Sequence, residues 1–414
     1  MAAPPHIPDR PVARRWVFYI PGYDPIHPRR YRELYRTESA AQARISGYEI
    51  ALSARQGGAR YGWNVKGVSD GARVEASVDV LVWSDIVRDS MATSIPGTYL
   101  QLLRTAWVYI GSGALWRLMR LRKGPVIAAL YPVGMLMGQL FLSYLIARIA
   151  VWGIQQLLVP FAGLAGHVVA FGAGLALFVW VMRWFKAKDS KFFAYYLMHD
   201  YAFGAATRGA NTPQLEARIA EFGDAIAAAL ASDVDEVLVV GHSSGAHLGV
   251  SVLADLVRQG RVPDKGPALG FLTLGQVVPM VSFLEKAHRL RADLAYLSTS
   301  DALAWVDVTA PGDGCAFALC DPVAVSGVAP EGQGWPLVFS AAFTKSLSPA
   351  RWKELRWRFF RLHFQYMCAF DRPRDYDYFQ ITAGPMTLAD RYRDRAPSKS
   401  RITKPVNKFT SVLP

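Results

Sequence analysis

Apolar residues recur with two different spacings along this chain, and one long stretch is almost free of polar residues. An apolar run at residues 15–20, stopped by Pro21 and Gly22, predicts a short buried strand. Residues 28–46 have the composition of a helix. Residues 48–83 contain β-rich runs separated by glycine-containing turns, which predict a hairpin that leads into a longer strand.

The second half of the chain repeats this alternation of strands and helices. Strands are expected at 235–240, 269–274 and 303–309, and helices at 192–206, 212–231, 245–259, 278–292 and 349–366. Strands that alternate with helices are typical of α/β proteins whose sheet is largely parallel. The pattern therefore predicts an α/β fold with a mostly parallel sheet flanked by helices.

A long apolar stretch interrupts this alternation. No side chain is charged between Lys123 and Arg148, and none between Arg148 and Arg183. A membrane-spanning helix needs about 20 mostly apolar residues, and each interval is longer than that. We therefore predict an inserted transmembrane hairpin of two helices, at residues 125–149 and 161–182. A pair of buried core helices is the alternative, but core helices rarely stay apolar on every face for so long.

Basic residues flank the hairpin on its outer sides only. The turn between the helices, near Gln155, Gln156 and Pro160, has no positive charge. Because basic residues collect on the cytoplasmic side of a membrane, both ends of the hairpin are expected in the cytoplasm, at the inner membrane. An even number of spans also returns the chain to its starting side. The flanking basic residues are Arg117, Arg120, Arg122, Lys123, Arg183, Lys186, Lys188 and Lys191.

The segments combine into one organisation. Residues 99–122 mix apolar residues with arginines and are expected to lie along the membrane surface as an amphipathic helix. The first residues are rich in proline and lack the apolar core of a signal peptide. The expected parts are a mobile leader at 1–14, the first part of the α/β domain at 15–98, the interfacial helix at 99–122, the transmembrane hairpin at 123–185, the main part of the domain at 190–390 and a basic tail at 391–414.

Composition agrees with a membrane location. Hydrophobic residues make up 52% of the 414 residues, and charged residues only 19%, below the quarter or so that is usual in soluble proteins. The net charge of +13 is compatible with a nucleic-acid partner. However, no zinc-knuckle spacing, helix-turn-helix pattern or aromatic RNA-binding motif accompanies it. We therefore expect membrane lipids as partners, and no nucleic acid.

The three cysteines, Cys315, Cys320 and Cys368, do not form the pattern of a disulfide framework, which favours a reducing compartment. Cys315 and Cys320 lack further His or Cys residues at metal-binding spacing, so we expect small buried side chains and no metal. The sequence also lacks a phosphate-binding glycine loop and a His-Glu-x-x-His motif. No cofactor is therefore expected.

The most specific motif is Gly241-His242-Ser243-Ser244-Gly245. It directly follows the apolar run 237–240 and opens a predicted helix of small residues. This is the context of a nucleophile elbow, in which a serine lies on a strained turn from a strand to a helix. The serine hydroxyl also lies at the helix N-terminus, where a developing negative charge is stabilised. The alternative is a glycine-rich turn without catalysis.

With this motif the sequence resembles the α/β-hydrolase superfamily, over residues 15–24 and 211–390. The resemblance implies a serine esterase or lipase-like enzyme whose triad follows the chain order Ser, acid, His. It assigns Ser243 as nucleophile. Beyond the predicted helix at 245–259 only His288 and His363 remain, and His363 is favoured as the base because it follows all the candidate acids.

Three aspartates compete for the role of the acid. Asp313 lies in a turn just past the predicted strand at 303–309, where acids of the superfamily usually stand, and it is preferred. Asp307 lies within that strand, and Asp321 follows later. A turn-forming aspartate without catalytic function is the alternative for Asp313.

The resemblance also implies an oxyanion hole made of two backbone N–H groups. One is expected from Ser244, directly after the nucleophile. The other is expected from Tyr23, or else from Gly22, in the loop that follows the strand at 15–20. Many members of the superfamily have His-Gly where this chain has Pro21-Gly22. An ordinary strand-ending turn is the alternative.

These features predict a membrane-associated serine hydrolase that cleaves a lipid-like or hydrophobic acyl ester through an acyl-enzyme. An acyltransferase or thioesterase with the same triad is the nearest alternative. A non-catalytic membrane scaffold on a hydrolase fold is the alternative from another class. The scaffold would have a misplaced His363 or a covered Ser243.

Overall fold

The computed structural model describes residues 11–55, 57, 60–92 and 94–413. The chain forms two compact units. Unit 1 comprises the segments Met1–Asp89, Ser112–Pro125 and Thr207–Pro414, and unit 2 comprises Ser90–Gly111 and Val126–Ala206. Residues 1–10 of the predicted leader at 1–14 lie outside the described residues. From there on the chain is packed, since the Val12 N–H donates a 2.8 Å hydrogen bond to the Pro385 carbonyl.

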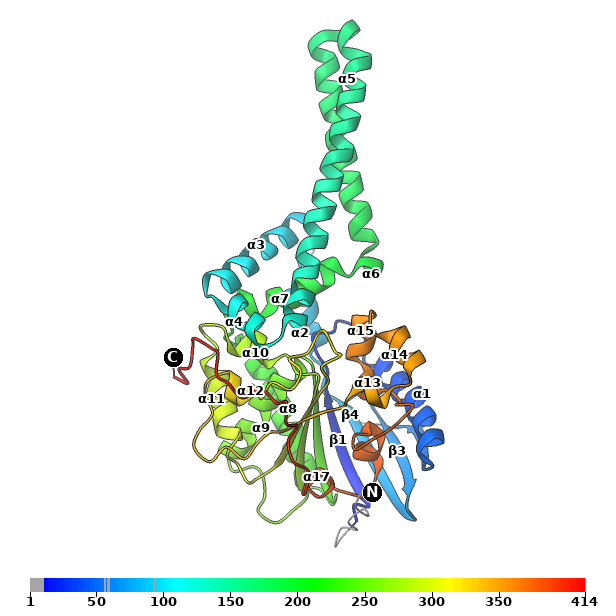
Figure 1. The fold of residues 1–414 in the computed structure, drawn as a ribbon, viewed down its shortest axis with the longest axis vertical. Coiled ribbons are helices and arrows are strands. Elements are labelled where there is room, and N and C mark those ends of the chain that lie inside the picture. The colour runs from blue at the N-terminus through cyan, green and yellow to red at the C-terminus, as the bar shows by residue number, and fades with distance from the viewer. Residues whose placement is uncertain (1–10, 56, 58–59, 93, 414) are drawn as a thin grey trace. The chain divides into compact units, whose positions relative to one another are not determined.

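The described part of unit 1 is built on one eight-stranded sheet in the order β2-β3-β4-β1-β5-β6-β7-β8. The strands are β1 (Arg14–Ile20), β2 (Glu49–Ala54), β3 (Gly62–Ser69), β4 (Ala72–Val80), β5 (Glu236–His242), β6 (Ala268–Leu274), β7 (Ala304–Thr309) and β8 (Leu337–Ser340). Six neighbouring strands, from β4 to β8 in this order, run parallel, and β3 is antiparallel to both β2 and β4. The predicted α/β class with a mostly parallel sheet is confirmed (Figure 1).

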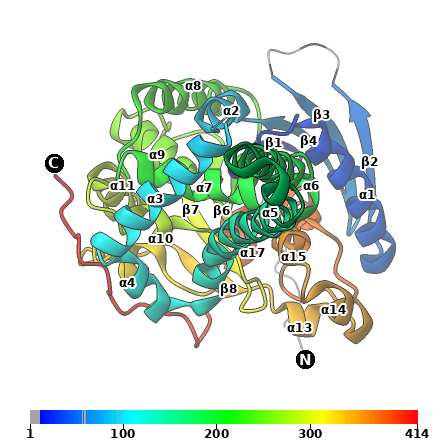
Figure 2. The ribbon, with the colours of Figure 1, turned by 90° about the horizontal axis from the view of Figure 1, so that it is seen from above.

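Helices cover both faces of this sheet. On one face, Val17 and Tyr19 of β1 join a buried apolar cluster with Tyr31 and Tyr35. On the other face, Ile20 lies against α9, which packs beside α8 and α11 (Figure 2). The first face is covered by α1 (Arg29–Ser46), α16 (Tyr378–Ala383) and α17 (Leu388–Tyr392), and the second by α8 (Pro213–Leu230), α9 (Gly245–Arg258) and α11 (His288–Leu297).

Two helices that the sequence pattern predicts as continuous are interrupted. Residues 278–292 form α10 (Val278–Ser282) and only the start of α11. The buried Arg291 donates hydrogen bonds to the carbonyls of the intervening turn, which replace the missing helical bonds. Residues 349–366 likewise divide into three pieces. These are α14 (Pro349–Leu355), α15 (Phe359–His363) and the 3-10 helix η1 (Gln365–Met367). Other short helices are α2 (Ser84–Ser90), α4 (Ala114–Leu121), α12 (Pro322–Val325) and α13 (Phe343–Ser346).

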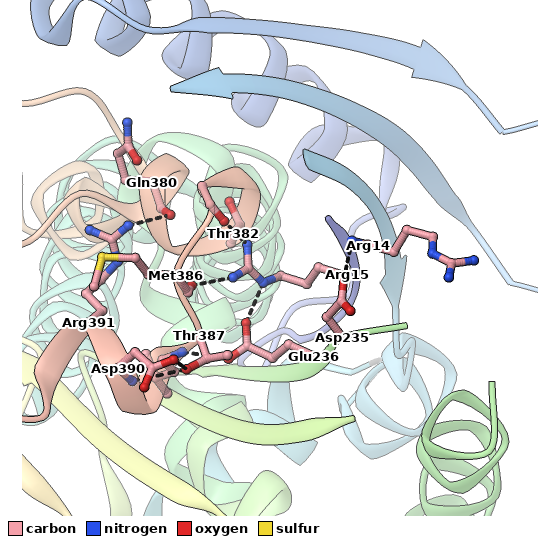
Figure 3. A network of polar contacts seen from close by, with 12 residues as sticks. Arg14, Arg15, Asp235, Glu236, Gln380, Thr382, Met386, Thr387, Asp390 and Arg391 are labelled. Atoms are coloured by element: carbon pink, nitrogen blue, oxygen red, sulfur yellow. Dashed lines mark hydrogen bonds and ion pairs between the residues drawn. The ribbon is translucent and has the colours of Figure 1, made fainter. Parts of the chain in front are cut away.

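A buried ion pair joins the beginnings of β1 and β5. Arg15 Nε lies 2.5 Å from Glu236 Oε2, and the two side chains are 0% and 1% exposed. Arg15 also donates to the carbonyls of Gly384 and Met386, at 2.8 and 2.6 Å. The other carboxylate oxygen of Glu236 accepts from the Leu388 N–H. The pair therefore fastens the C-terminal segment to the two central strands (Figure 3).

The basic tail predicted at 391–414 is packed along unit 1 over its described residues. Ile402 exchanges backbone hydrogen bonds with Leu319 and Asp321. Further along, the Asn407 side chain donates to the carbonyls of Ser282 and Ser326. Backbone and side-chain hydrogen bonds thus join the tail to segments far away in the sequence.

Unit 2 contains α3 (Ile95–Gly111), most of α5 (Lys123–Ala187), α6 (Asp189–Phe192) and α7 (Ala194–Ala206). A buried cluster formed by α3, α5 and α7 holds it together, with Leu102, Leu136 and Met198 among its members. The prediction of a single helix at 99–122 is wrong in one respect. It is divided into α3 and α4 at Ser112 and Gly113, where Gly113 adopts a left-handed φ of 73°.

In place of the predicted pair of spanning helices the chain has one long helix of 65 residues, α5, which is bent at Gly163. By length and composition, α5 is the one helix among the described residues that could cross a membrane, where the sequence pattern predicts two. Its helical geometry fails inside this range at Gly163, with φ 50° and ψ −123°. The helix runs on through Gln155 and Pro160, so the predicted turn is misplaced.

The two arms of α5 on either side of Gly163 lie against one another. Gln155 Nε2 is 3.2 Å from His167 Nδ1. A Cβ on Gly174 would lie 2.2 Å from Val151 Cγ2. Residues between Ala147 and Leu158 lie beside the second arm, so the first arm continues past the end of the predicted first span at 125–149.

Candidate active site

Ser243 lies on the turn between β5 and α9. Its φ is 55°, in the left-handed region that a residue with a side chain rarely adopts. The flanking glycines make this turn possible. A Cβ on Gly245 would lie 2.1 Å from the Ile20 carbonyl oxygen, and one on Gly241 would lie 2.7 Å from the Gly245 carbonyl oxygen. Strand β1, the turn and the start of α9 can therefore pack together only with glycine at both positions.

The strain at Ser243 is held by its surroundings. Its N–H donates a 2.9 Å hydrogen bond to the Leu274 carbonyl at the end of β6, and its own carbonyl accepts from the Ala246 N–H. A positive φ of this kind costs on the order of 1–3 kcal/mol and is found mainly at functional sites. Ser243 is half-buried, while both of its neighbours in the turn are buried.

His363 and Asp313 form a buried pair. His363 Nδ1 lies 2.7 Å from Asp313 Oδ2, although the residues are 50 positions apart in the chain. Asp313 is 2% exposed and His363 6%. The other carboxylate oxygen of Asp313 accepts from the Cys315 N–H at 2.9 Å. Such a carboxylate fixes the ring orientation and leaves Nε2 as the nitrogen available to a substrate or nucleophile.

The histidine and the serine meet around the ends of β5 and β6. Gly275 directly follows Leu274, and a Cβ placed on it would lie 3.0 Å from His363 Cε1. His242 Nε2 is 3.0 Å from the His363 carbonyl oxygen, and the two imidazole centroids are 4.7 Å apart. Among the hydrogen bonds of the described residues, none joins Ser243 Oγ directly to His363. Catalytic hydrogen bonds often tighten only when substrate binds.

The other candidates from the sequence have different surroundings. Asp307 is buried within β7 and accepts a 2.6 Å hydrogen bond from Thr273 Oγ1. Burial raises the pKa of Asp307 to about 8, which keeps this carboxyl protonated at neutral pH. Asp321 caps the N-terminus of α12 by accepting from two backbone N–H groups. His288 begins α11, and its Nδ1 lies 3.2 Å from an Arg291 nitrogen.

The two segments predicted to supply the oxyanion hole both lie next to Ser243. Ser244 precedes α9 as its N-cap, and among the described residues no hydrogen bond uses its backbone N–H. A Cβ on Gly22 would lie 3.0 Å from Ser243 Cβ and 3.4 Å from Ser243 Oγ. The loop after β1 therefore approaches the serine closely. Tyr23, the next residue, is buried at 4% exposure.

Three residues around this site have no role in the sequence-based prediction. Tyr366 donates a 3.0 Å hydrogen bond to Asp313 Oδ2, and it accepts one from the Ala310 N–H. Gly275 has a φ of 54° and leaves space for the rings of Tyr366 and His363. Burial, with a further contribution from His363, lowers the pKa of His242 well below its usual value, so His242 is neutral. Of these three residues, only Gly275 has a signal in the sequence, because a glycine directly after the predicted strand at 269–274 indicates a close approach by another segment.

Asp313, His363 and Cys315 also have the donor types of a metal site. One possible ligand atom from each lies within 4.8 Å of the others, the one such group among the described residues. However, both oxygens of Asp313 already accept hydrogen bonds from the other two residues. These bonds account for the cluster without an ion.

Comparison with known proteins adds no family to this geometry. No protein-family model matches the sequence, and no curated protein or solved structure matches it.

Proposed function

We propose that this protein is a membrane-associated serine hydrolase that cleaves hydrophobic acyl esters. The observation that carries the proposal is the strained, half-buried Ser243 beside the buried His363–Asp313 pair. A serine held at a positive φ between a strand and a helix is the arrangement of a nucleophile elbow. The α/β-hydrolase resemblance of the sequence is part of the same proposal.

In the proposed reaction, Ser243 Oγ attacks the ester carbonyl and His363 Nε2 takes its proton. The N–H groups of Ser244 and Tyr23 stabilise the negative oxygen of the tetrahedral intermediate. His363 then gives the proton to the leaving alcohol, and an acyl-enzyme remains. Water, activated by His363, cleaves the acyl-enzyme and releases the acid. Asp313 orients His363 and stabilises its charged form, and Tyr366 holds Asp313 in place.

The scaffold alternative is less well supported. A non-catalytic protein on this fold would leave His363 away from an acid or would cover the serine. Here His363 is hydrogen-bonded to Asp313, and Ser243 is only half-buried. A hydrolase and an acyltransferase differ in whether water or another molecule accepts the acyl group. We propose water, because it requires no second substrate.

Covalent labelling tests the nucleophile. A fluorophosphonate probe reacts with an activated serine, and we expect it to label the wild-type protein at Ser243. Ser243→Ala should abolish labelling, and Ser244→Ala, a matched change at the next position, should retain it because only the backbone N–H of Ser244 is used. Labelling of the Ser243→Ala variant at an undiminished rate would contradict the proposal.

We further propose that α5 inserts into the membrane. Only 22% of its most apolar stretch is buried, and large side chains such as Phe141, Trp152, Phe161 and Trp180 are 58–90% exposed. Exposed apolar surface of this extent is unfavourable in water but not in lipid. Because the chain folds back at Gly163, basic residues at both ends of α5 lie on one side, which the positive-inside rule makes cytoplasmic.

Extraction and labelling test this insertion. The full-length protein should remain in the membrane pellet after alkaline carbonate, because the apolar arms are held by lipid. A single cysteine introduced at Gly163, in a variant with its three native cysteines changed to serine, should react with an impermeant thiol reagent from outside the cytoplasm. The same reagent should reach a cysteine at Lys188 only after lysis. Release by carbonate, or equal labelling of both positions in intact cells, would exclude the proposed topology.

A further inference from the structure

Arg30 lies at the edge of the candidate active site. It is the second residue of α1, and its Nη1 donates a 2.9 Å hydrogen bond to Asp24 Oδ2. Asp24 is two residues beyond Gly22, the residue that approaches Ser243. The guanidinium group is thus attached to the loop that supplies one of the proposed oxyanion donors.

The same guanidinium group contacts the loop that carries the proposed base. Its Cζ lies 5.0 Å from the centroid of the Phe364 ring, and Phe364 directly follows His363. The Phe364 ring in turn lies 5.0 Å from the ring of His242, next to the nucleophile. The positive charge of Arg30 also contributes to the lowered pKa of the buried His242. Arg30 therefore lies between the two loops that surround Ser243.

Arg30 keeps the capacity to bind a second anion. Its side chain is 37% exposed, whereas that of Asp24 is 7% exposed. Asp24 is well satisfied, because it also accepts from the Tyr31 hydroxyl and from the Ile26 N–H at 2.9 Å. The bond to Asp24 is the one hydrogen bond of the Arg30 side chain among the described residues. A guanidinium group has five N–H donors, and its planar fork matches carboxylate and phosphate oxygens.

We propose that Arg30 binds an anionic group of the substrate, so that the site prefers acyl esters whose alcohol part carries a phosphate or a carboxylate. The inference rests on the proposed function and specifies its substrate class. The ester carbonyl would lie at Ser243, and the anionic group would point toward α1. The anion could belong to a lipid headgroup or to a small soluble ester, and the two sources are distinguished below.

A pair of soluble esters tests the preference. The anionic 4-(butyryloxy)benzoate and the neutral 4-(butyryloxy)benzamide share one acyl group, and their rates are corrected for spontaneous hydrolysis. We expect wild-type kcat/KM to favour the anionic ester by about tenfold, the usual scale of one charge-assisted hydrogen bond. Arg30→Gln should remove this preference through a higher KM for the anionic ester alone. Arg29→Gln, the same charge change at an exposed neighbour, should preserve it.

A pair of lipids tests the membrane source. Palmitoyl lysophosphatidylglycerol and monopalmitoylglycerol carry the same acyl chain, with and without a phosphate. If the preference for the anionic member depends on Arg30 in the lipid pair only, the anionic group belongs to a lipid headgroup. If it depends on Arg30 in both pairs, any acyl ester with an anionic alcohol part is a substrate. Equal losses for the anionic and neutral members in Arg30→Gln would overturn the proposal, because they would indicate that Arg30 only positions the loop through Asp24.

A binding measurement separates this proposal from the proposed function. Dodecyl phosphate should slow fluorophosphonate labelling of Ser243 about tenfold more in wild type than in Arg30→Gln, and neutral dodecyl glucoside should slow both equally. If Ser243 is labelled but dodecyl phosphate protects both proteins equally, the role of Arg30 is wrong while the hydrolase remains. If Ser243 is not labelled at all, the proposed function fails and this inference fails with it.

Discussion

Changing His363 to alanine should lower kcat for ester cleavage by about 10⁴- to 10⁶-fold, because the members of a catalytic triad act as one unit. For the same reason the double variant Ser243→Ala/His363→Ala should be no less active than either single variant. Asp313→Asn should lower kcat by about 10⁴-fold, since an amide cannot stabilise the charged form of His363. Initial rates of the purified protein in detergent, with circular dichroism to check folding, measure these effects.

Asp307→Asn is the matched control for the acid. Asp307 is protonated and bonded to Thr273, so the change to an amide removes no charge at neutral pH. We expect kcat to change less than about twofold, within the range of mutations that do not touch the reacting groups. A severe loss in Asp307→Asn together with full activity in Asp313→Asn would show that Asp313 is not the acid.

The second large effect is expected on stability, from the pair that fastens the C-terminal segment to β1 and β5. Glu236→Gln leaves the charge of Arg15 buried without a carboxylate, and this should lower the free energy of unfolding of unit 1 by about 3–5 kcal/mol. Denaturant titration in detergent, followed by tryptophan fluorescence, measures the loss. The exposed pair of Arg14 and Asp233 lies beside it, and Asp233→Asn should cost at most about 1 kcal/mol.

The double variant Arg15→Met/Glu236→Leu provides the complementary measurement. Replacing a buried ion pair by apolar side chains of similar size is often neutral, because no charge is left unpaired. We therefore expect this variant to be clearly more stable than Glu236→Gln. A double variant as unstable as the single one would mean that the hydrogen bonds of Arg15 to Gly384 and Met386 matter more than the ion pair.

The parts of this molecule that the sequence predicts well are those set by local pattern. The turn at Ser243 needs only the strand before it, the helix after it and the glycines between, all within a few residues of the chain. The alternation of strands and helices likewise predicts the parallel sheet. The short β8 escapes prediction because four residues give too little periodicity, and its pairing with β7 depends on distant residues.

The remainder of the site depends on contacts between distant segments. Asp313 can be preferred from its place after a strand, but its bond to Tyr366 is made in a segment that divides into α14, α15 and η1, where the sequence pattern predicts one helix. Arg30 has no motif that would mark it, since its position near His242 arises only when α1 packs beside the sheet. The bend at Gly163 escapes prediction for another reason. Polar residues near Gln155 look like a turn, yet they do not end a helix, whereas glycine tolerates the φ of 50° found here.

The position of β1 in the sheet has a consequence for the order of events during synthesis. Among the described strands β1 comes earliest in the chain, and its neighbour β4 ends at Val80. Glu236, the partner of Arg15 in the other neighbouring strand, β5, lies 221 positions after Arg15. At roughly 5–20 residues per second, the ribosome needs on the order of 10–45 s to reach it. During this interval the open edge of β1, with its apolar Trp16, Val17 and Phe18, is a template for pairing with other chains. A nascent chain of this protein is therefore expected to need a chaperone, or early contact with the membrane, more than its final fold would suggest.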